Sequence, residues 1–171
     1  KAGKNKLLLK ICQGSGEWAF YFQPSMNIPP AVTWLFEDIS DKVGLGDRGI
    51  GSAVKGDTLT IADVNGDGRP DFLYGAGNGV LVLNNGKAFV EAKEHAISYK
   101  PGRVGPVFAD FDNDGCLDLF VPQNGICKLF KGDGKGHFTD VTEKAGDLSK
   151  AIAQATCAAW GDFDSDGKLD L

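Results

Sequence analysis

One acidic nine-residue pattern occurs three times in this chain of 171 residues, and its spacing constrains the fold more than any other feature. The copies, called loops 1, 2 and 3 below, span residues 63–71, 110–118 and 162–170 and begin 47 and 52 residues apart. Each has Asp or Asn at positions 1, 3, 5 and 9 and glycine at position 6. A period near fifty residues is typical of propeller blades or solenoid units and argues against one ordinary domain.

The side chains of this pattern predict calcium-binding loops. Calcium prefers six to eight oxygen ligands, and alternate residues of a tight loop can direct their oxygens toward one point. Glycine at position 6 permits the positive φ that turns the chain back. We expect about three Ca²⁺ ions, one per loop, with the main-chain carbonyl of position 7 completing each set. The predicted ligands are Asp63, Asn65, Asp67, Arg69 and Asp71; Asp110, Asp112, Asp114, Cys116 and Asp118; and Asp162, Asp164, Asp166, Lys168 and Asp170.

An alternative without metal is that each loop is a set of Asx-turns, in which an Asp side chain bonds the nearby backbone. We favour the metal hypothesis because one Asx-turn needs one carboxylate, whereas each loop holds three or four. Eleven of the 23 acidic residues of the chain lie in the three loops. Without a bound cation, each loop would be a self-repelling cluster of acids.

The flanks of the loops predict strands. An EF-hand needs a glutamate at position 12 and a helix on each side, but position 12 is Tyr74 in loop 1 and Val121 in loop 2. Alternating or continuous apolar residues at 58–62, 71–74 and 117–121 favour β-structure. Each loop is therefore predicted to join two strands.

A second landmark keeps the same period. Segments that begin at Phe36, Phe89 and Phe138 align with one another and start 53 and 49 residues apart. Within one period we predict four strands, at 106–111, 117–122, 126–131 and 137–142, with a hairpin turn at Asn124-Gly125. Four short antiparallel strands at this period fit a β-propeller blade. The predicted fold is all-β, with units at 36–88 and 89–137 and an incomplete unit at 138–171.

The first 35 residues stand outside the repeat. Residues 5–12 and 17–22 read as a two-stranded hairpin, which is similar to the closing strands of galactose-binding-like β-sandwiches. We therefore expect a β-sandwich-like module or N-terminal hairpin at 1–27 and a linker at 28–35, where Pro29-Pro30 favours an extended chain. The other interpretation is a strand that pairs with the edge of the propeller.

The sequence of the repeat resembles that of the FG-GAP/VCBS repeat family, which includes the integrin α-subunit propeller. The resemblance rests on Ala-Asp-Phe-Asp-Asn-Asp-Gly at 109–115 and Phe-Thr-Asp-Val-Thr at 138–142, and it covers roughly residues 36–171. Ala-Ala-Trp-Gly-Asp-Phe-Asp at 158–164 is closest to the bacterial ASPIC/UnbV and cartilage-acidic-protein-type propellers. Loop 1 departs from the pattern, with Asn65 for Asp and Pro70 for Leu.

The resemblance implies a seven-bladed propeller with calcium in the blade hairpins. It also implies an extracytoplasmic location (periplasmic, cell-surface or secreted) and the binding of partners. We expect about two and a half blades here, as a segment of a longer chain whose remaining blades are partners. The expected function is non-enzymatic binding of a protein or carbohydrate, with calcium in a structural role. The alternative is part of a propeller-based polysaccharide lyase or hydrolase.

Other signals in the sequence are weaker. No candidate catalytic set is present, and the two histidines, His95 and His137, lie in no recognised catalytic motif. No apolar run is long enough to span a bilayer, and no basic block suggests nucleic acid. Four cysteines, at 12, 116, 127 and 157, allow three sets of pairings. Because Cys116 would lie far from Cys127 across their hairpin, we expect free, buried thiols.

Overall fold

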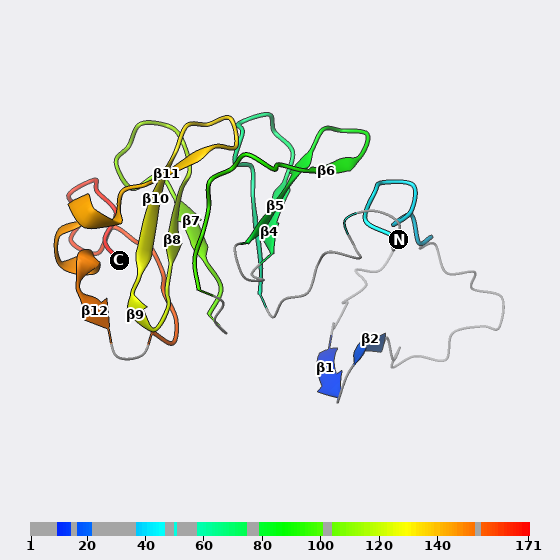
Figure 1. Cartoon of the computed structure of the whole chain (residues 1–171), viewed down its shortest axis with the longest axis horizontal. Coiled ribbons are helices and arrows are strands. Elements are labelled where there is room, and N and C mark those ends of the chain that lie inside the picture. Colours follow the sequence, from blue (N-terminus) through cyan, green and yellow to red (C-terminus); the bar gives the residue numbers. More distant parts are fainter. Residues whose placement is uncertain are drawn as a thin grey trace, which may run out of the picture. The chain divides into compact units, whose positions relative to one another are not determined.

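The computed structural model describes residues 10–14, 17–21, 37–46, 50, 58–74, 79–100, 104–152 and 155–171. The chain divides into two compact units, Lys1–Glu37 and Asp38–Leu171. In the first unit, strands β1 (Lys10–Gly14) and β2 (Glu17–Tyr21) form an antiparallel hairpin, as the sequence predicts (Figure 1). The expected linker at 28–35 and the expected start of the repeat at Phe36 lie outside the described residues.

The second unit contains two four-stranded antiparallel sheets, in each of which the strands lie side by side in chain order (Figure 1). Sheet 1 comprises β3 (Leu59–Ala62), β4 (Asp71–Tyr74), β5 (Val80–Asn84) and β6 (Phe89–Glu91). Sheet 2 comprises β7 (Val107–Ala109), β8 (Asp118–Val121), β10 (Lys128–Gly132) and β11 (Phe138–Asp140). The all-β fold and the unit of four strands are thereby confirmed.

One predicted strand is wrong in detail, because the segment expected at 126–131 is divided in two. The ladder between β8 and β10 ends at Lys128 opposite Val121, since the next residue of β8 would be Pro122, which has no N–H to donate. Before that point, β9 (Gly125–Ile126) pairs instead with β12 (Ala151–Ile152). Between β11 and β12 the chain forms two short 3₁₀ helices, η2 (Thr142–Lys144) and η3 (Gly146–Ser149).

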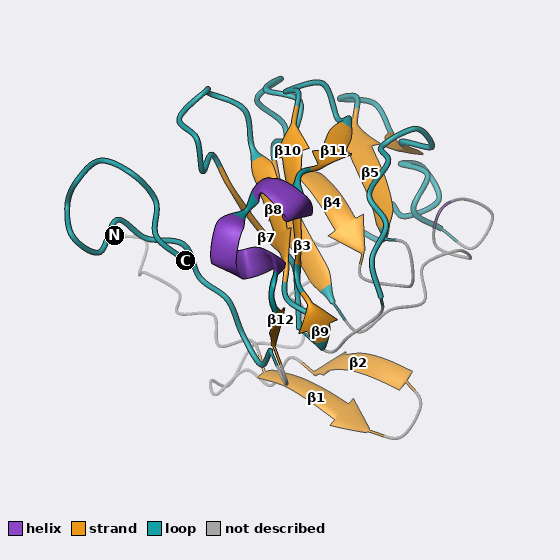
Figure 2. Cartoon of the chain, turned by 60° about the vertical axis from the view of Figure 1, so that its left-hand side comes forward, coloured by secondary structure: helices purple, strands orange, loops and turns teal. Residues whose placement is uncertain are grey.

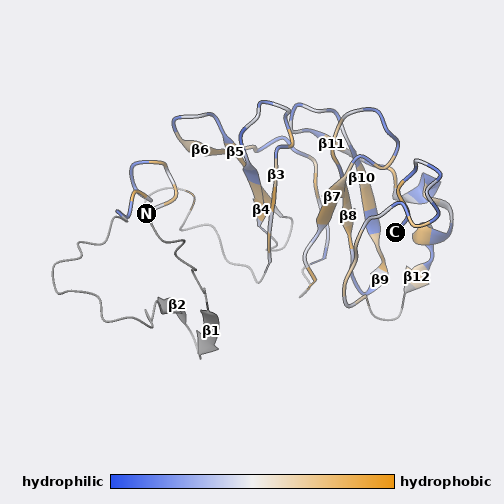
Figure 3. Cartoon of the chain, turned by 180° about the vertical axis from the view of Figure 1, so that it is seen from behind, coloured by the Kyte–Doolittle hydropathy of each residue, from blue (hydrophilic) through white to orange (hydrophobic). Residues whose placement is uncertain are grey.

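The hydrophobic core lies mainly in the seam between the two sheets. Leu73 and Leu81 of sheet 1 belong to one buried cluster with Leu119, Phe130 and Phe138 of sheet 2. In β4, buried residues alternate with half-buried ones because successive residues point to opposite faces, whereas all four residues of β8 are buried. Figure 3 shows apolar colouring concentrated on the strands and mostly polar colouring in the loops.

The opposite face of sheet 2 is also covered. Phe120 and Leu129 pack there against Leu148 of η3 and against Trp160, which precedes loop 3. Figure 2 shows the short helices in front of this sheet. The first strand of sheet 1, in contrast, leaves Leu59 and Ile61 53% and 56% exposed. Loops 1 and 2, which connect the first two strands of each sheet, lie at the same end of the unit (Figure 1).

The cysteines that the structure describes in full are free thiols. Cys127 is buried between β9 and β10, Cys116 in loop 2 is half-buried, and Cys157 is exposed. The predicted absence of a bridge between Cys116 and Cys127 is confirmed. The expectation of burial holds for Cys127 alone among these three.

Candidate metal-binding loops

All three loops share one hydrogen-bond framework. The carboxylate at position 1 accepts main-chain N–H bonds from positions 5 and 6, at 2.7 to 3.1 Å. The carboxylate at position 5 accepts the N–H of position 7, at 2.8 to 2.9 Å. The glycines at position 6 have φ of +82°, +85° and +83° in loops 1, 2 and 3, so the predicted positive φ is confirmed. These local bonds explain why one sequence pattern produces one loop shape three times.

Position 9 ties loops 1 and 2 to their sheets. Asp71 is 1% exposed and accepts the N–H of Val64, at 3.0 Å, and of Asn84 at the end of β5, at 2.8 Å. Asp118 is equally buried and accepts the N–H of Phe111, at 3.0 Å, and of Gly132 at the end of β10, at 2.9 Å.

Burial raises the pKa of both carboxyls, and the N–H donors lower it in part. The sequence assigned these two residues as ligands, and the structure adds an anchoring role for each.

In loop 3 the corresponding residue is exposed. Asp170 accepts the N–H of Phe163 at 2.8 Å, as its counterparts do in the other loops. Two main-chain bonds between Gly161 and Asp170 close the loop.

The loops differ in how many carboxylates they bring together. In loop 2, one oxygen from each of Asp110, Asp112 and Asp118 lies within 4.8 Å of the others. In loop 3, the same holds for Asp162, Asp164 and Asp166. Asp114 and Asp170 lie outside these groups. Loop 1 forms no such trio of acidic side chains in the part of the chain that the structure describes, and its position 3 carries the amide of Asn65.

A basic side chain lies among the acids of every loop. Lys131, from β10, forms ion pairs with Asp112 and, at 2.7 Å, with Asp114. Hydrogen bonds to these two carboxylates raise the pKa of Lys131. The bond that Lys131 donates to Asp114 lowers the pKa of that carboxyl.

In loop 1 the guanidinium of Arg69 pairs with Asp67 and donates to the carbonyl of Asn84. In loop 3 the Lys168 ammonium lies 3.6 Å from Asp166. Lys131 was not among the predicted site residues, because only the pairing of β8 with β10 brings it beside loop 2.

The donor sets of loops 2 and 3 fit a hard divalent cation. Oxygens bound to one calcium ion at 2.3–2.6 Å lie at most about 5 Å apart, and each trio meets this limit. The Asx-turn bonds are also present, so the two hypotheses are compatible. A carboxylate oxygen has two lone pairs, and one N–H bond leaves the other free for a cation. The carbonyls of Arg69, Cys116 and Lys168 remain predicted ligands.

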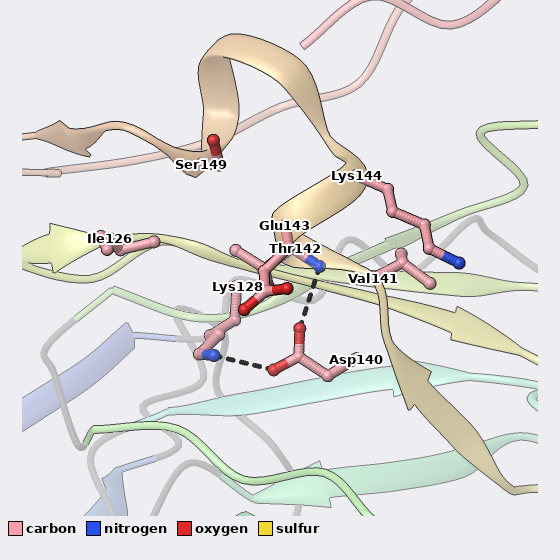
Figure 4. A pocket seen from close by; sticks show the side chains of 8 residues that line it. All are labelled: Ile126, Lys128, Asp140, Val141, Thr142, Glu143, Lys144 and Ser149. Carbon is pink, nitrogen blue, oxygen red and sulfur yellow. Dashed lines mark hydrogen bonds and ion pairs between the residues drawn. The ribbon is translucent and has the colours of Figure 1, made fainter.

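Outside the loops, an open hollow of about 470 Å³ lies beside η2 (Figure 4). The Lys128 ammonium and the Asp140 carboxylate pair there at 2.7 Å, and Asp140 also accepts the N–H of Thr142 at 2.9 Å. Burial would raise the pKa of Asp140, but these partners hold it below its usual value. The hollow is lined by Ile126, Lys128, Asp140, Val141, Thr142, Glu143, Lys144 and Ser149. Its two acids and two lysines suit polar contacts better than metal binding.

A known repeat family includes the segment that holds loops 1 and 2. Residues 63–121, from the first residue of loop 1 to the end of β8, match the FG-GAP-like repeat. The chain belongs to the FG-GAP repeat family. In this chain, loops 1 and 2 lie between the first and second strands of sheets 1 and 2, as the sequence predicts.

Curated relatives extend the likeness beyond the repeat. The chain is 32% identical over 151 residues to cartilage acidic protein 1 of Xenopus tropicalis, an alignment that covers 80% of this chain and 22% of that protein. It is 31% identical over 128 residues to cartilage acidic protein 1 of Homo sapiens, an alignment that covers 66% of this chain and 19% of that protein. The chain therefore spans about a fifth of the length of these curated relatives. Among the described residues, no helix is both long and apolar enough to cross a membrane.

Proposed function

We propose that this FG-GAP repeat chain is a calcium-stabilised, non-enzymatic segment of an extracytoplasmic propeller that binds a protein or carbohydrate partner. The observation that carries the proposal is the approach of Asp110, Asp112 and Asp118 to within 4.8 Å in loop 2. The trio in loop 3 supports it independently. Loop 1, with the same backbone framework, is proposed as the third and weakest site, because Asn65 contributes no charge.

In this proposal the ion supplies positive charge that neutralises the acids of a β-hairpin. Asp110 and Asp112 hold the ion at the tip of the hairpin. Asp118 binds it while also accepting the N–H of Gly132, so the ion is connected to the third strand of sheet 2. Calcium therefore braces three strands at once, and its role is structural.

The energetic consequence follows from mass action. At about 1 mM free calcium, a site with a Kd of about 10–100 µM stabilises the folded chain by about 1.4–2.7 kcal/mol. Three such sites together would be comparable to the stability of a small domain, about 5–15 kcal/mol. Sites of this strength stay empty at cytosolic calcium levels and fill outside the cell. The name of the relatives, cartilage acidic protein, agrees with an extracellular location.

The partner surface is proposed to lie among the loops and hollows of the unit, completed by the remaining blades of a longer chain. The hollow beside η2 offers paired charges from Lys128 and Asp140 and an exposed apolar residue, Ile126. Such a mixed surface suits the polar groups of a protein or carbohydrate.

A calorimetric calcium titration of the metal-stripped chain, with thermal unfolding at each calcium level, tests the proposal. We expect saturation near three ions, one per loop, and a melting temperature that rises with occupancy. Asp112→Ala and Asp164→Ala should each lower calcium affinity and calcium-dependent stability together.

Asp147→Ala, which removes an exposed carboxylate outside the loops, is the matched control and should change neither quantity. Absence of binding, or binding without any change in stability, would contradict the structural role.

A further inference from the structure

Loops 2 and 3 are joined directly to each other by a side-chain hydrogen bond. The Nδ2 of Asn113 donates to the carbonyl oxygen of Gly167 at 3.0 Å, across 54 residues of sequence. Asn113 is position 4 of loop 2, between the proposed ligands Asp112 and Asp114. Gly167 is position 6 of loop 3, between Asp166 and Lys168. The bond therefore connects two peptide segments that each lie between proposed ligands.

An aromatic contact fixes the bases of the same two loops. The ring of Phe111, at position 2 of loop 2, stacks on Trp160 with centroids 6.4 Å apart and planes inclined by 13°. Trp160 lies two residues before loop 3, and its indole N–H donates to the carbonyl of Val107 in β7 at 3.5 Å. Loops 2 and 3 are thus connected through a packed contact as well as a polar one.

Loops 1 and 2 also have a packed contact, but among the described residues no side-chain hydrogen bond joins them. Val64, at position 2 of loop 1, and Phe108, two residues before loop 2, both belong to the core cluster of the seam. Position 4 of loop 1 is Gly66, which has no side chain to reach loop 2. Asn113 and Gly66 share a left-handed backbone, with φ of 58° and 70°, and asparagine tolerates that conformation better than most residues.

We propose that Asn113 couples cation binding in loops 2 and 3, so that an ion in one loop raises the affinity of the other, whereas loop 1 binds independently. This inference rests on the proposed calcium function. A cation orders the loop that holds it, and ordering loop 2 fixes the side chain that holds the Gly167 peptide in place. Loop 3 then loses less conformational freedom when it binds its own ion, and the effect is reciprocal.

The test uses the full chain and resolves the loops individually by NMR. The amides of Gly68, Gly115 and Gly167 each donate to the position-1 carboxylate of their own loop, so each reports the occupancy of one loop during a calcium titration. Loop 3 is disabled by Asp164→Ala, and the affinity of loop 2 is read from Gly115. The measurement is repeated in the Asn113→Gly chain, which keeps the left-handed backbone and removes the donor.

We expect Asp164→Ala to weaken calcium binding at Gly115 by about two- to tenfold, the range of a single hydrogen bond, and to leave Gly68 unchanged. In the Asn113→Gly chain, Asp164→Ala should no longer affect Gly115. Ser165→Gly is the matched control, because Ser165 occupies position 4 of loop 3 with φ of 61°, and in that chain the coupling should persist.

Two contrary outcomes are distinguishable. The coupling is refuted, and the calcium function stands, if all three amides respond to calcium but Asp164→Ala leaves the affinity read from Gly115 unchanged. The same conclusion follows if Asp164→Ala changes that affinity equally in the parent and Asn113→Gly chains. If no glycine amide responds to calcium, the proposed function fails and the coupling fails with it.

Discussion

Loops 1 and 2 share a backbone and differ in chemistry. In both, position 1 accepts two N–H bonds, and a buried aspartate at position 9 reaches the third strand of its sheet. Loop 2 adds a trio of carboxylates and a lysine from β10, whereas loop 1 has Asn65 at position 3 and pairs Asp67 with Arg69.

The difference teaches that most of the loop framework is kept while the charge at position 3 changes. Positions 1, 5, 6 and 9 supply the contacts and the backbone turn that loops 1 and 2 share, and in loop 1 the Asn65 side chain at position 3 adds a bond from the N–H of Asp67. Position 3 and the nearby cation set its charge. The loop can therefore keep its shape while its affinity for an ion changes.

The largest expected effect tests the shared framework. Asp118→Ala should lower the free energy of unfolding by about 2–4 kcal/mol even in EDTA, because it leaves two main-chain N–H groups without an acceptor. Asp71→Ala should cost a similar amount. Urea denaturation in EDTA measures both changes. Asp170→Ala, which removes the exposed counterpart in loop 3, is the control and should cost much less. A loss below about 1 kcal/mol for Asp118→Ala would contradict its role as an anchor.

The next effect tests whether position 3 separates the two loops. Asn65→Asp should raise the calcium affinity of loop 1 by about three- to tenfold, because one more anionic ligand faces the ion. Asp112→Asn should lower that of loop 2 by a similar factor. The Gly68 and Gly115 amides report the two affinities during calcium titration. Unchanged affinities in both variants would remove position 3 as the cause of the difference.

A smaller effect is expected from the resident cations. Lys131→Met should raise the calcium affinity of loop 2 about threefold, because an ammonium that contacts Asp112 and Asp114 repels a divalent ion. Arg69→Met should act in the same direction at loop 1. Both gains should shrink in high salt, which screens exposed charges. A loss of affinity in Lys131→Met would instead assign the lysine to positioning Asp112.

The smallest effect lies in the seam that both sheets share. The hydroxyl of Tyr99 is buried without a hydrogen-bond partner among the described residues, and burial raises its pKa to about 12. Unfolded tyrosine ionises near pH 10, so the unfolded state releases its proton first. Stability contributed by the neutral side chain is complete below about pH 10 and is lost between about pH 10 and 12.

Tyr99→Phe should therefore leave the free energy of unfolding unchanged or raise it by up to about 1 kcal/mol at pH 7. It should also make stability less sensitive to alkaline pH, which urea denaturation at several pH values would reveal. The calcium affinities of loops 1 and 2 should stay equal to those of the parent chain. A marked loss of stability at pH 7 would mean that the hydroxyl has a favourable partner in the folded chain.

The sequence by itself determined the features whose interactions are local. Asp110, Asp114 and Gly115 make their framework bonds within one nonapeptide, so the pattern alone predicted the loop and its positive φ. The same holds for the strands on either side, whose alternating or continuous apolar residues predicted β-structure. Because these units recur at a fixed period, the four-stranded sheet and the family also followed from the sequence.

Tertiary structure decided what depends on strand pairing and on the packing of one sheet against the next. Asp118 meets Gly132 across 14 residues, Lys131 meets Asp112 across 19, and Asn113 meets Gly167 across 54. No local pattern encodes such contacts, because each requires the register of a ladder or the position of a neighbouring loop. Asp118 therefore carries in the sequence the mark of a ligand, and only the folded chain shows that it also anchors a hairpin.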